Sequence, residues 1–185
     1  LVRDLFALAR NERRPSRPFD LSRLLDEVAA LLRAQAPDAV TVSLELPSEP
    51  VIAQGEEKEI ERVIINLCRN GIQAMTDMRP PEEKRGGELG IRLLKPNPFY
   101  CRLEVADRGV GIAPEVLARL FTPFFSTKAQ HGGSGLGLAA SKAIAEAYGG
   151  RIEAANREGG GAVFALVLLA APPASLRARP PTMRH

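Results

Sequence analysis

The sequence predicts an α+β fold, a two-layer α/β sandwich in which about three helices cover one face of a mixed β-sheet. Three observations support this prediction. Helical and strand-like patterns follow one another along the 185 residues in the order α-β-β-α-β-β-α-α-β-β. Two pairs of neighbouring strands are joined by turns alone, so each pair forms a hairpin without a crossover connection. The longer helices have one apolar stripe, which suits them to pack on a sheet.

The N-terminal third of the chain begins with a helical pattern over residues 1–10, which resembles the end of a longer helix. Pro15 and Pro18 stop that pattern and predict a short linker. Asp20 then stands at the N-cap position of an amphipathic helix. The predicted elements of this part are the helix 21–35 and strands at 41–46 and 51–53.

The rest of the chain contains one long helical pattern, two hairpins and two shorter helices. Arg79-Pro80-Pro81 ends the long helix, and Gly149-Gly150 closes the last one. Beyond Ala171 the chain is rich in proline and arginine, and residues 171–185 are predicted to be a disordered tail. The predicted elements are the helix 56–78, strands 89–95 and 99–106, helices 114–120 and 139–148, and strands 151–155 and 162–169.

The composition is that of a soluble globular domain, with 45% hydrophobic and 25% charged residues. No apolar run reaches the roughly 20 residues that span a bilayer, and Leu1 does not open a signal-peptide pattern. Cys68 and Cys101 lie in a predicted helix and a predicted strand, so we expect small core residues in a reducing compartment rather than a metal or redox pair. These features predict a cytoplasmic location.

The net charge of +3 comes from the two ends of the chain. Five arginines lie in residues 1–18 and three in the tail, which leaves 17 basic and 20 acidic residues in 19–170. A nucleic-acid surface would need a basic face with aromatic platforms, and only 5% of the residues are aromatic. No nucleic-acid partner is therefore expected.

Asn66 and Asn70 are four residues apart in the long helix, so their side chains share one surface. Asparagine is a mediocre helix former, and two in mid-helix indicate either a solvated face or a polar site. An amide oxygen is a hard ligand that suits Mg²⁺, which takes its other ligands from phosphates and water. The pair is thus a candidate magnesium and phosphate site.

Asp107 ends a predicted strand and opens the glycine cluster DRGVGI. It could be an ordinary turn residue. As a base reader, a buried carboxylate would accept from the exocyclic amine of adenine, whereas guanine has a carbonyl on the equivalent edge. Gly109 and Gly111 would leave room for a flat ring.

A second glycine cluster, GGSGLGL, runs into the helix predicted at 139–148. A glycine-rich loop that ends at a helix N-terminus offers unpaired N–H groups to an anion. A Rossmann dinucleotide site does not fit, because no parallel βαβ unit surrounds the cluster. A Walker-type Gly-Lys-Ser/Thr is absent too, so the pattern favours a different nucleotide-binding fold.

Four motifs occur in one order: EIERVIINLCRNGIQAM, DRGVGI, FTPFFSTK and GGSGLGL. Together they resemble the N box, first glycine box, F box and second glycine box of the ATP-binding catalytic domain of bacterial sensor histidine kinases. These kinases share the Bergerat (GHKL) fold with gyrase, Hsp90 and MutL. The resemblance covers residues 19–170, and the motif sequences look closest to those of the nitrogen-regulation branch of these kinases.

The resemblance implies ATP and Mg²⁺ as cofactors and gives each motif a role. Asn70 would be the Mg²⁺ ligand, Asn66 its phosphate-side neighbour, and Lys128 would reach phosphate oxygens. Asp107 would take the adenine amino group. Phe121, Phe124 and Phe125 would form the hinge of a lid whose mobile part is 129–134. The catalytic set would be Asn66, Asn70 and Lys128, and the nucleotide-binding set would further include Asp107, Gly109, Gly111, Ile112, Phe121, Thr127, Gly133, Ser134, Gly135, Leu136 and Gly137.

Two positions depart from the family pattern. Gly71 stands where many histidine kinases have alanine, which should cost some helix stability. Gln73 stands where many have lysine or arginine, which puts more weight on Lys128 and Arg69 for phosphate contacts.

The resemblance also implies partners. His131 and His185 do not lie in a helical dimerisation motif, so the phosphoacceptor histidine is expected on a dimerisation domain outside this chain. Residues 1–18 would be the end of that domain's helix and a linker, 19–170 the catalytic domain. A response regulator receiver domain would act downstream. The isolated domain is expected to be a monomer and its parent a homodimer that can be anchored in the inner membrane.

Two alternatives remain at this point. Gyrase-type ATPases activate water with a glutamate one helical turn before the Mg²⁺ asparagine, and the chain has Asn66 there. Asparagine cannot act as a base, which favours transfer to a histidine over ATP hydrolysis. The other alternative is a serine-kinase or nucleotide-binding interaction module.

Overall fold

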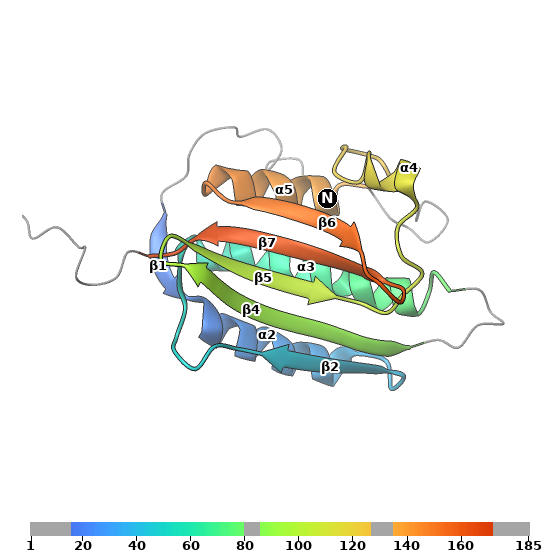
Figure 1. Ribbon diagram of the computed structural model, residues 1–185, viewed down its shortest axis with the longest axis horizontal. Helices are drawn as coiled ribbons and strands as arrows, with labels where there is room; N and C mark the ends of the chain where they lie inside the picture. The colour runs from blue at the N-terminus through green and yellow to red at the C-terminus, as the bar shows by residue number, and fades with distance from the viewer. Residues whose placement is uncertain (1–15, 80–85, 127–134, 172–185) are drawn as a thin grey trace, which may run out of the picture.

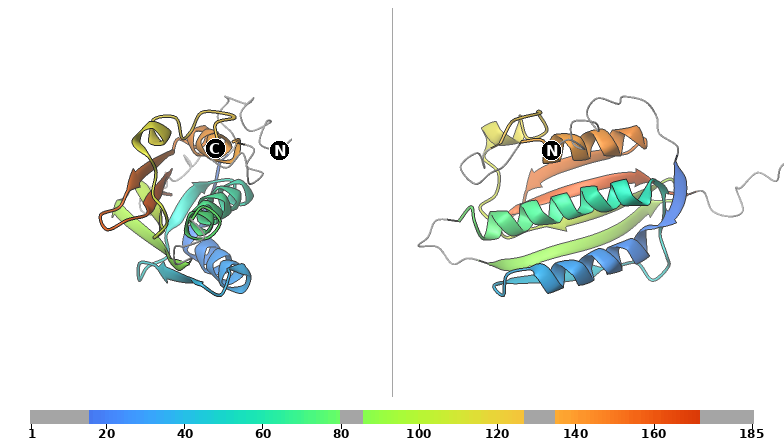
Figure 2. Two further views of the ribbon diagram at one scale, coloured as in Figure 1. Left: turned by 90° about the vertical axis from the view of Figure 1, so that its right-hand side faces the viewer. Right: turned by 180° about the vertical axis from the view of Figure 1, so that it is seen from behind.

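The computed structural model describes residues 16–79, 86–126 and 135–171. It confirms the predicted two-layer sandwich: helices α2, α3 and α5 lie side by side on one face of a five-stranded mixed sheet (Figures 1 and 2). The helices are α2 (Leu21–Gln35), α3 (Glu57–Met75), α4 (Pro114–Leu117) and α5 (Gly137–Ala147). The strands are β1 (Arg17–Asp20), β2 (Val40–Glu45), β3 (Ile52–Gly55), β4 (Gly87–Asn97), β5 (Tyr100–Ala106), β6 (Arg151–Asn156) and β7 (Ala162–Leu169).

The main sheet has the strand order β2-β4-β5-β7-β6. Both predicted hairpins are confirmed, since β4 pairs antiparallel with β5 and β6 antiparallel with β7. β2 pairs parallel with β4, and the connection between them runs through β3 and α3. The antiparallel β5–β7 pair joins the two hairpins, so the end of β5 lies beside the start of β7.

The linker predicted from Pro15 and Pro18 is wrong at its C-terminal end. Arg17–Asp20 form strand β1, which pairs antiparallel with β3 in a separate two-stranded sheet. Pro18 faces Gln54 there, and a proline is tolerated because the strand is an edge. Asp20 is the N-cap of α2 as predicted, with its Oδ1 accepting from Arg23 N at 3.0 Å. Pro15 and the helix predicted at 1–10 lie outside the described residues.

Several other boundaries differ from their predictions. Helix α3 ends at Met75 instead of residue 78, and α4 is four residues long. Helix α5 begins two residues early, at Gly137. Ala171 was predicted to begin the disordered tail, but it is buried and donates its N–H to Ile52 O at 2.8 Å. This contact with strand β3 extends the described fold by one residue.

The core lies between the sheet and the three helices, where α2 packs on β2, α3 on β4 and β5, and α5 on β6 and β7. Cys68 and Cys101 are both in this core, as predicted. Burial raises the pKa of the Cys68 thiol to about 12 and that of Cys101 to about 11. Both therefore remain protonated, unreactive core residues at neutral pH.

The opposite face of the sheet carries ion pairs instead of helices. Arg102 bridges Glu104 at 2.8 Å and Glu153 at 2.6 Å, and Arg151 binds Glu153 at 2.7 Å. The long side chains cover Ala165, the β7 residue aligned with Glu104 and Glu153, which stays buried. No helix among the described residues is long and apolar enough to cross a bilayer.

Candidate functional site

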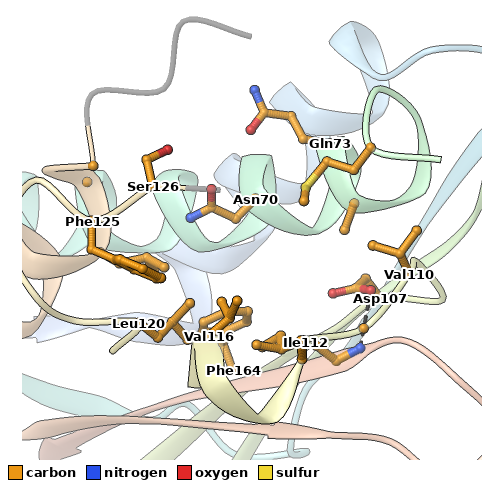
Figure 3. A pocket seen from close by; sticks show the side chains of 18 of the residues that line it. Asn70, Gln73, Asp107, Val110, Ile112, Val116, Leu120, Phe125, Ser126 and Phe164 are labelled. Carbon is orange, nitrogen blue, oxygen red and sulfur yellow. Dashed lines mark hydrogen bonds between the residues drawn. The ribbon is translucent and has the colours of Figure 1, made fainter. Parts of the chain in front are cut away.

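A cavity of about 510 Å³ opens between the C-terminal half of α3, the loop after β5 and the start of α5. This volume falls within the roughly 300–1,000 Å³ of small-molecule sites. The two glycine clusters and the asparagine helix, which are far apart in the sequence, meet here (Figure 3). The predicted site residues that line it are Asn66, Asn70, Asp107, Gly111, Ile112, Gly135 and Gly137.

Asp107 lies at one end of the cavity, beside Val110 (Figure 3), and is 2% exposed. Its Oδ1 accepts from Gly109 N at 2.8 Å and from Ala162 N at 3.2 Å. Its own N–H donates to Ala162 O at 2.9 Å, which continues the β5–β7 ladder by one residue. The sheet and the glycine turn together hold the carboxylate in place, and it is the only acidic side chain among the described residues that line the cavity.

Two glycines allow the backbone to come close to Asp107. Gly161 has a φ of +85°, and a Cβ there would lie 2.1 Å from Asp107 O. Gly71 is buried in α3, and a Cβ there would lie 2.6 Å from Leu89 Cδ1 and 3.3 Å from Asp107 Cβ. The Gly71 position, expected only to cost helix stability, therefore lets the helix approach β4 and Asp107.

The walls between the two ends of the cavity are apolar. Ile112, Val116, Leu120, Phe125 and Phe164 face the hollow in Figure 3. A flat aromatic base fits between such walls, with its polar edge against a carboxylate. Val116, Leu120 and Phe164 were not predicted as site residues, because each stands in an ordinary apolar pattern and only the tertiary fold brings it to the cavity.

The other end of the cavity is formed by asparagines of α3 and the start of α5. Figure 3 shows the Asn70 side chain directed toward Ser126 across the cavity. Asn66 Nδ2 donates to Ser141 Oγ on α5 at 2.9 Å. A Cβ on Gly137 would lie 2.8 Å from Asn66 Oδ1, so α5 begins in close contact with the Asn66 amide. The two asparagines thus have different surroundings, although both line the cavity.

A backbone contact joins the F box to the residue two positions before α5. Phe124 N donates to Gly135 O at 3.0 Å, and Phe124 has a φ of +64° with 70% of its surface exposed. Phe125 stacks with the Arg119 guanidinium, whose Cζ lies 4.6 Å from the ring centroid. The F-box residues Thr127 and Lys128 and the glycine-cluster residues Gly133 and Ser134 lie outside the described residues, as does the whole predicted mobile part of the lid, 129–134.

Three predicted binding residues are described but do not line the cavity. Gly109 supports Asp107 from behind through its N–H. Phe121 packs against the core, with Lys142 Nζ 5.8 Å from its ring centroid, so Leu120 and Phe125 take the place predicted for it. Leu136 is 1% exposed and buried beneath the start of α5. Arg69 is exposed on α3, whereas Gln73 lines the cavity.

The described residues contain no group of three or more His, Cys, Asp or Glu side chains that could hold a metal ion. The amide oxygen of Asn70 is one of the side-chain oxygen donors that line the cavity. That donor set fits an ion that takes one protein ligand and the rest from phosphates and water, as Mg²⁺ does in nucleotide sites.

Residues 55–172 match the protein family described as histidine kinase-, DNA gyrase B- and HSP90-like ATPase. The two-component sensor PprA of Pseudomonas aeruginosa is 34% identical over 94% of this chain and 19% of its own length. The sensor protein FixL of Bradyrhizobium diazoefficiens is 34% identical over 92% of this chain and 32% of its own length. The chain thus spans about a fifth and about a third of these relatives.

Solved structures are similar as well. The catalytic domain of histidine kinase ThkA superposes with a TM-score of 0.72 at 28% identity, covering 86% of this chain and 100% of that domain. Full-length ShkA in complex with AMPPNP superposes with a TM-score of 0.75 at 27% identity, covering 96% of this chain and 37% of ShkA. The fold and the sequence comparisons agree.

Proposed function

This chain belongs to the histidine kinase-, DNA gyrase B- and HSP90-like ATPase family and is an ATP-binding catalytic domain of the sensor histidine kinase type; we propose that it transfers the γ-phosphoryl group of ATP to a histidine of a longer parent kinase. The observation that supports this best is the cavity itself. It has a buried carboxylate, Asp107, at one end, apolar walls in the middle and the Asn70 amide at the other.

Each end of the cavity has its own task in this proposal. Asp107 accepts from the exocyclic amine of adenine, which guanine cannot offer at that edge, while Ile112 and Phe164 contact the base. The phosphates lie toward Asn70 and the start of α5, where Gly137 and Leu138 line the cavity and a helix N-terminus favours an anion. Lys128 adds a positive charge from the lid. A Mg²⁺ ion held by Asn70 and the phosphates would neutralise charge on the triphosphate.

The surroundings of Asn66 favour phosphoryl transfer over hydrolysis. Its amide already donates to Ser141 Oγ and has no basic atom that could take a proton from water. A neutral histidine needs no such base, because its imidazole nitrogen is itself nucleophilic. The chain therefore has to position the nucleotide and leave the phosphate end accessible to an acceptor.

The proposal extends to partners and location. In this proposal the acceptor histidine belongs to a dimerisation domain of a homodimeric parent. From there the phosphoryl group passes to the receiver domain of a response regulator. The catalytic domain acts in the cytoplasm, whether or not the parent is anchored in the inner membrane.

The test is phosphoryl transfer between separate molecules. The chain is mixed with radiolabelled Mg-ATP and the parent's dimerisation domain, and label is followed on both proteins. We expect label on the dimerisation domain and little on the chain itself. Asp107→Asn in the same mixture should weaken ATP binding by about tenfold or more, the cost of a lost hydrogen bond to a charged group, and narrow the preference for ATP over GTP.

Two outcomes would contradict the proposal. If the wild-type chain binds ATP but no label reaches the dimerisation domain, it is not a histidine kinase domain. If free phosphate accumulates steadily without an acceptor, the chain is an ATPase of the gyrase kind. Unchanged ATP-over-GTP discrimination in Asp107→Asn would remove Asp107 as the base reader.

A further inference from the structure

The last residue of β6 and the turn that follows it, residues 156–161 and here called the β6–β7 turn, contact the loop that carries Asp107. The Asn156 side chain binds one residue of that loop twice: its Oδ1 accepts from Ile112 N at 2.8 Å, and its Nδ2 donates to Ile112 O at 2.7 Å. These two bonds resemble the pair that a neighbouring strand would make, although Ile112 lies outside any strand. It fixes the backbone of Ile112, whose side chain forms part of the apolar wall.

The neighbouring residue binds the other end of the same loop. Arg157 Nη1 donates to Asp107 O at 2.8 Å. The turn is itself closed by Arg157 N donating to Gly161 O at 3.0 Å and by Gly160 N donating to Arg157 O at 3.2 Å. Asn156 and Arg157 therefore hold the two ends of the loop from one short turn.

The spacing between Asp107 and Ile112 sets where the base can lie. Asp107 supplies the polar edge and Ile112 one apolar wall, and the chain between them includes two glycines and no regular element. Gly111, which lies between these two residues, has a φ of +73°, and a Cβ on it would lie 3.2 Å from Asn156 Oδ1. The loop is therefore shaped against Asn156, and without that amide its backbone would have more freedom.

We propose that Asn156 is a positioning residue for adenine recognition and that Arg157 supports it from the same turn. This inference rests on the proposed ATP binding. Asn156 does not line the cavity and is exposed, so it acts through Ile112 rather than by touching the nucleotide. Its role is specific to the base, because both of its bonds go to the residue that forms a wall of the base end.

Asn97 is a matched control. It too is an exposed asparagine at a hairpin turn, and its Oδ1 accepts from Phe99 N at 3.0 Å and from Tyr100 N at 3.0 Å. Its turn, between β4 and β5, is at the other end of the sheet from the β6–β7 turn (Figure 1). Asn97→Ala thus removes two hydrogen bonds from a hairpin without touching the cavity.

The experiment measures the affinities of the chain for ADP, ATP and inosine triphosphate, whose base lacks the exocyclic amine, together with the thermal midpoint. Asn156→Ala should weaken ADP and ATP binding by the same factor, about tenfold for two lost hydrogen bonds of ordinary strength. It should also reduce the preference for ATP over inosine triphosphate. Asn97→Ala should lower the thermal midpoint about as much as Asn156→Ala does. It should leave the affinities for ADP, ATP and inosine triphosphate unchanged.

Asn156→Asp provides a second variant if the alanine variant does not fold. It keeps the acceptor for Ile112 N and places a carboxylate oxygen against Ile112 O, so it should also weaken ADP and ATP equally. Nucleotide affinities of the Asn156 variants that equal those of Asn97→Ala would overturn the inference, as would a loss confined to ATP, which would place the effect at the phosphates. If the wild type itself binds no ATP, the proposed function fails first.

Discussion

The base end and the phosphate end of the cavity are built from different kinds of contact. At the base end, backbone packs directly on backbone: Gly161 touches Asp107, and Ala162 exchanges hydrogen bonds with it. At the phosphate end, the contacts are made by side-chain amides of one helix, Asn66 and Asn70. A side-chain contact can be deleted with little strain, whereas backbone in close contact cannot yield without moving a strand.

This difference implies that substitutions at the base end disturb the fold and binding together. Substitutions at the phosphate end should change either the stability of the fold or nucleotide binding, one without the other. The contrast can be tested with pairs of substitutions. The two members of a pair lose the same backbone preference or the same kind of hydrogen bond, and they differ only in the residues around them.

The largest effect is expected for Gly161→Ala, with Gly159→Ala as its partner. Both glycines have left-handed backbone, with φ of +85° and +83°, so alanine costs about 1–2 kcal/mol at either. Nothing lies within 4 Å of a Cβ on Gly159, whereas one on Gly161 would lie 2.1 Å from Asp107 O. Gly161→Ala should therefore lower the free energy of unfolding by about 1–3 kcal/mol more than Gly159→Ala.

Urea unfolding with and without ADP measures both effects. ADP should stabilise the wild type and Gly159→Ala through preferential binding to the folded state, and should stabilise Gly161→Ala much less. Equal unfolding free energies for the two variants would mean that the end of β5 can move aside, and the base end would then be no more rigid than the phosphate end.

The sequence alone predicted the residues of the cavity that are recognisable from local pattern. Asn66 and Asn70 stand out because asparagine is unusual in mid-helix, and Asp107 because it joins a strand to a glycine turn. Ile112 and Gly137 followed from the motifs that contain them. All five line the cavity.

The residues that the sequence did not predict depend on contacts between distant segments. Asn156 is 44 positions from Ile112, and Arg157 is 50 positions from Asp107. In the sequence both belong to an ordinary hairpin turn, and only the β5–β7 pairing brings that turn to the loop. Strand β1 was missed for the same reason, since its partner β3 follows the whole of α2 and β2.

An intermediate effect is expected for Asn70→Ala at the phosphate end. If Asn70 is the one protein ligand of Mg²⁺, its loss should weaken Mg-ATP binding by at least about tenfold. ADP binding in the presence of EDTA should stay within about twofold of the wild type, because the base end is intact. Calorimetric titration with and without Mg²⁺ measures both. A change of twofold or less in Mg-ATP affinity would remove Asn70 as a metal ligand.

The smallest effect is expected for Ser141→Ala. Ser141 is 3% exposed on α5, and its Oγ accepts from Asn66 Nδ2. Losing this acceptor should lower the free energy of unfolding by about 1 kcal/mol. Ser22→Ala is the control, because Ser22 Oγ also accepts a hydrogen bond, from Val51 N at 3.0 Å, and no residue of α2 lines the cavity. Both variants should be destabilised to a similar degree.

Only the Ser141 variant should be coupled to Asn66. In a double-mutant cycle, Asn66→Ala should cost less when Ser141 is already alanine, since the bond they share can be lost only once. Ser22→Ala and Asn66→Ala should add independently. Additive costs for Asn66 and Ser141 would mean that their bond does not hold the start of α5 against α3. The position of that helix end would then depend on the close contact at Gly137, much as the base end depends on Gly161.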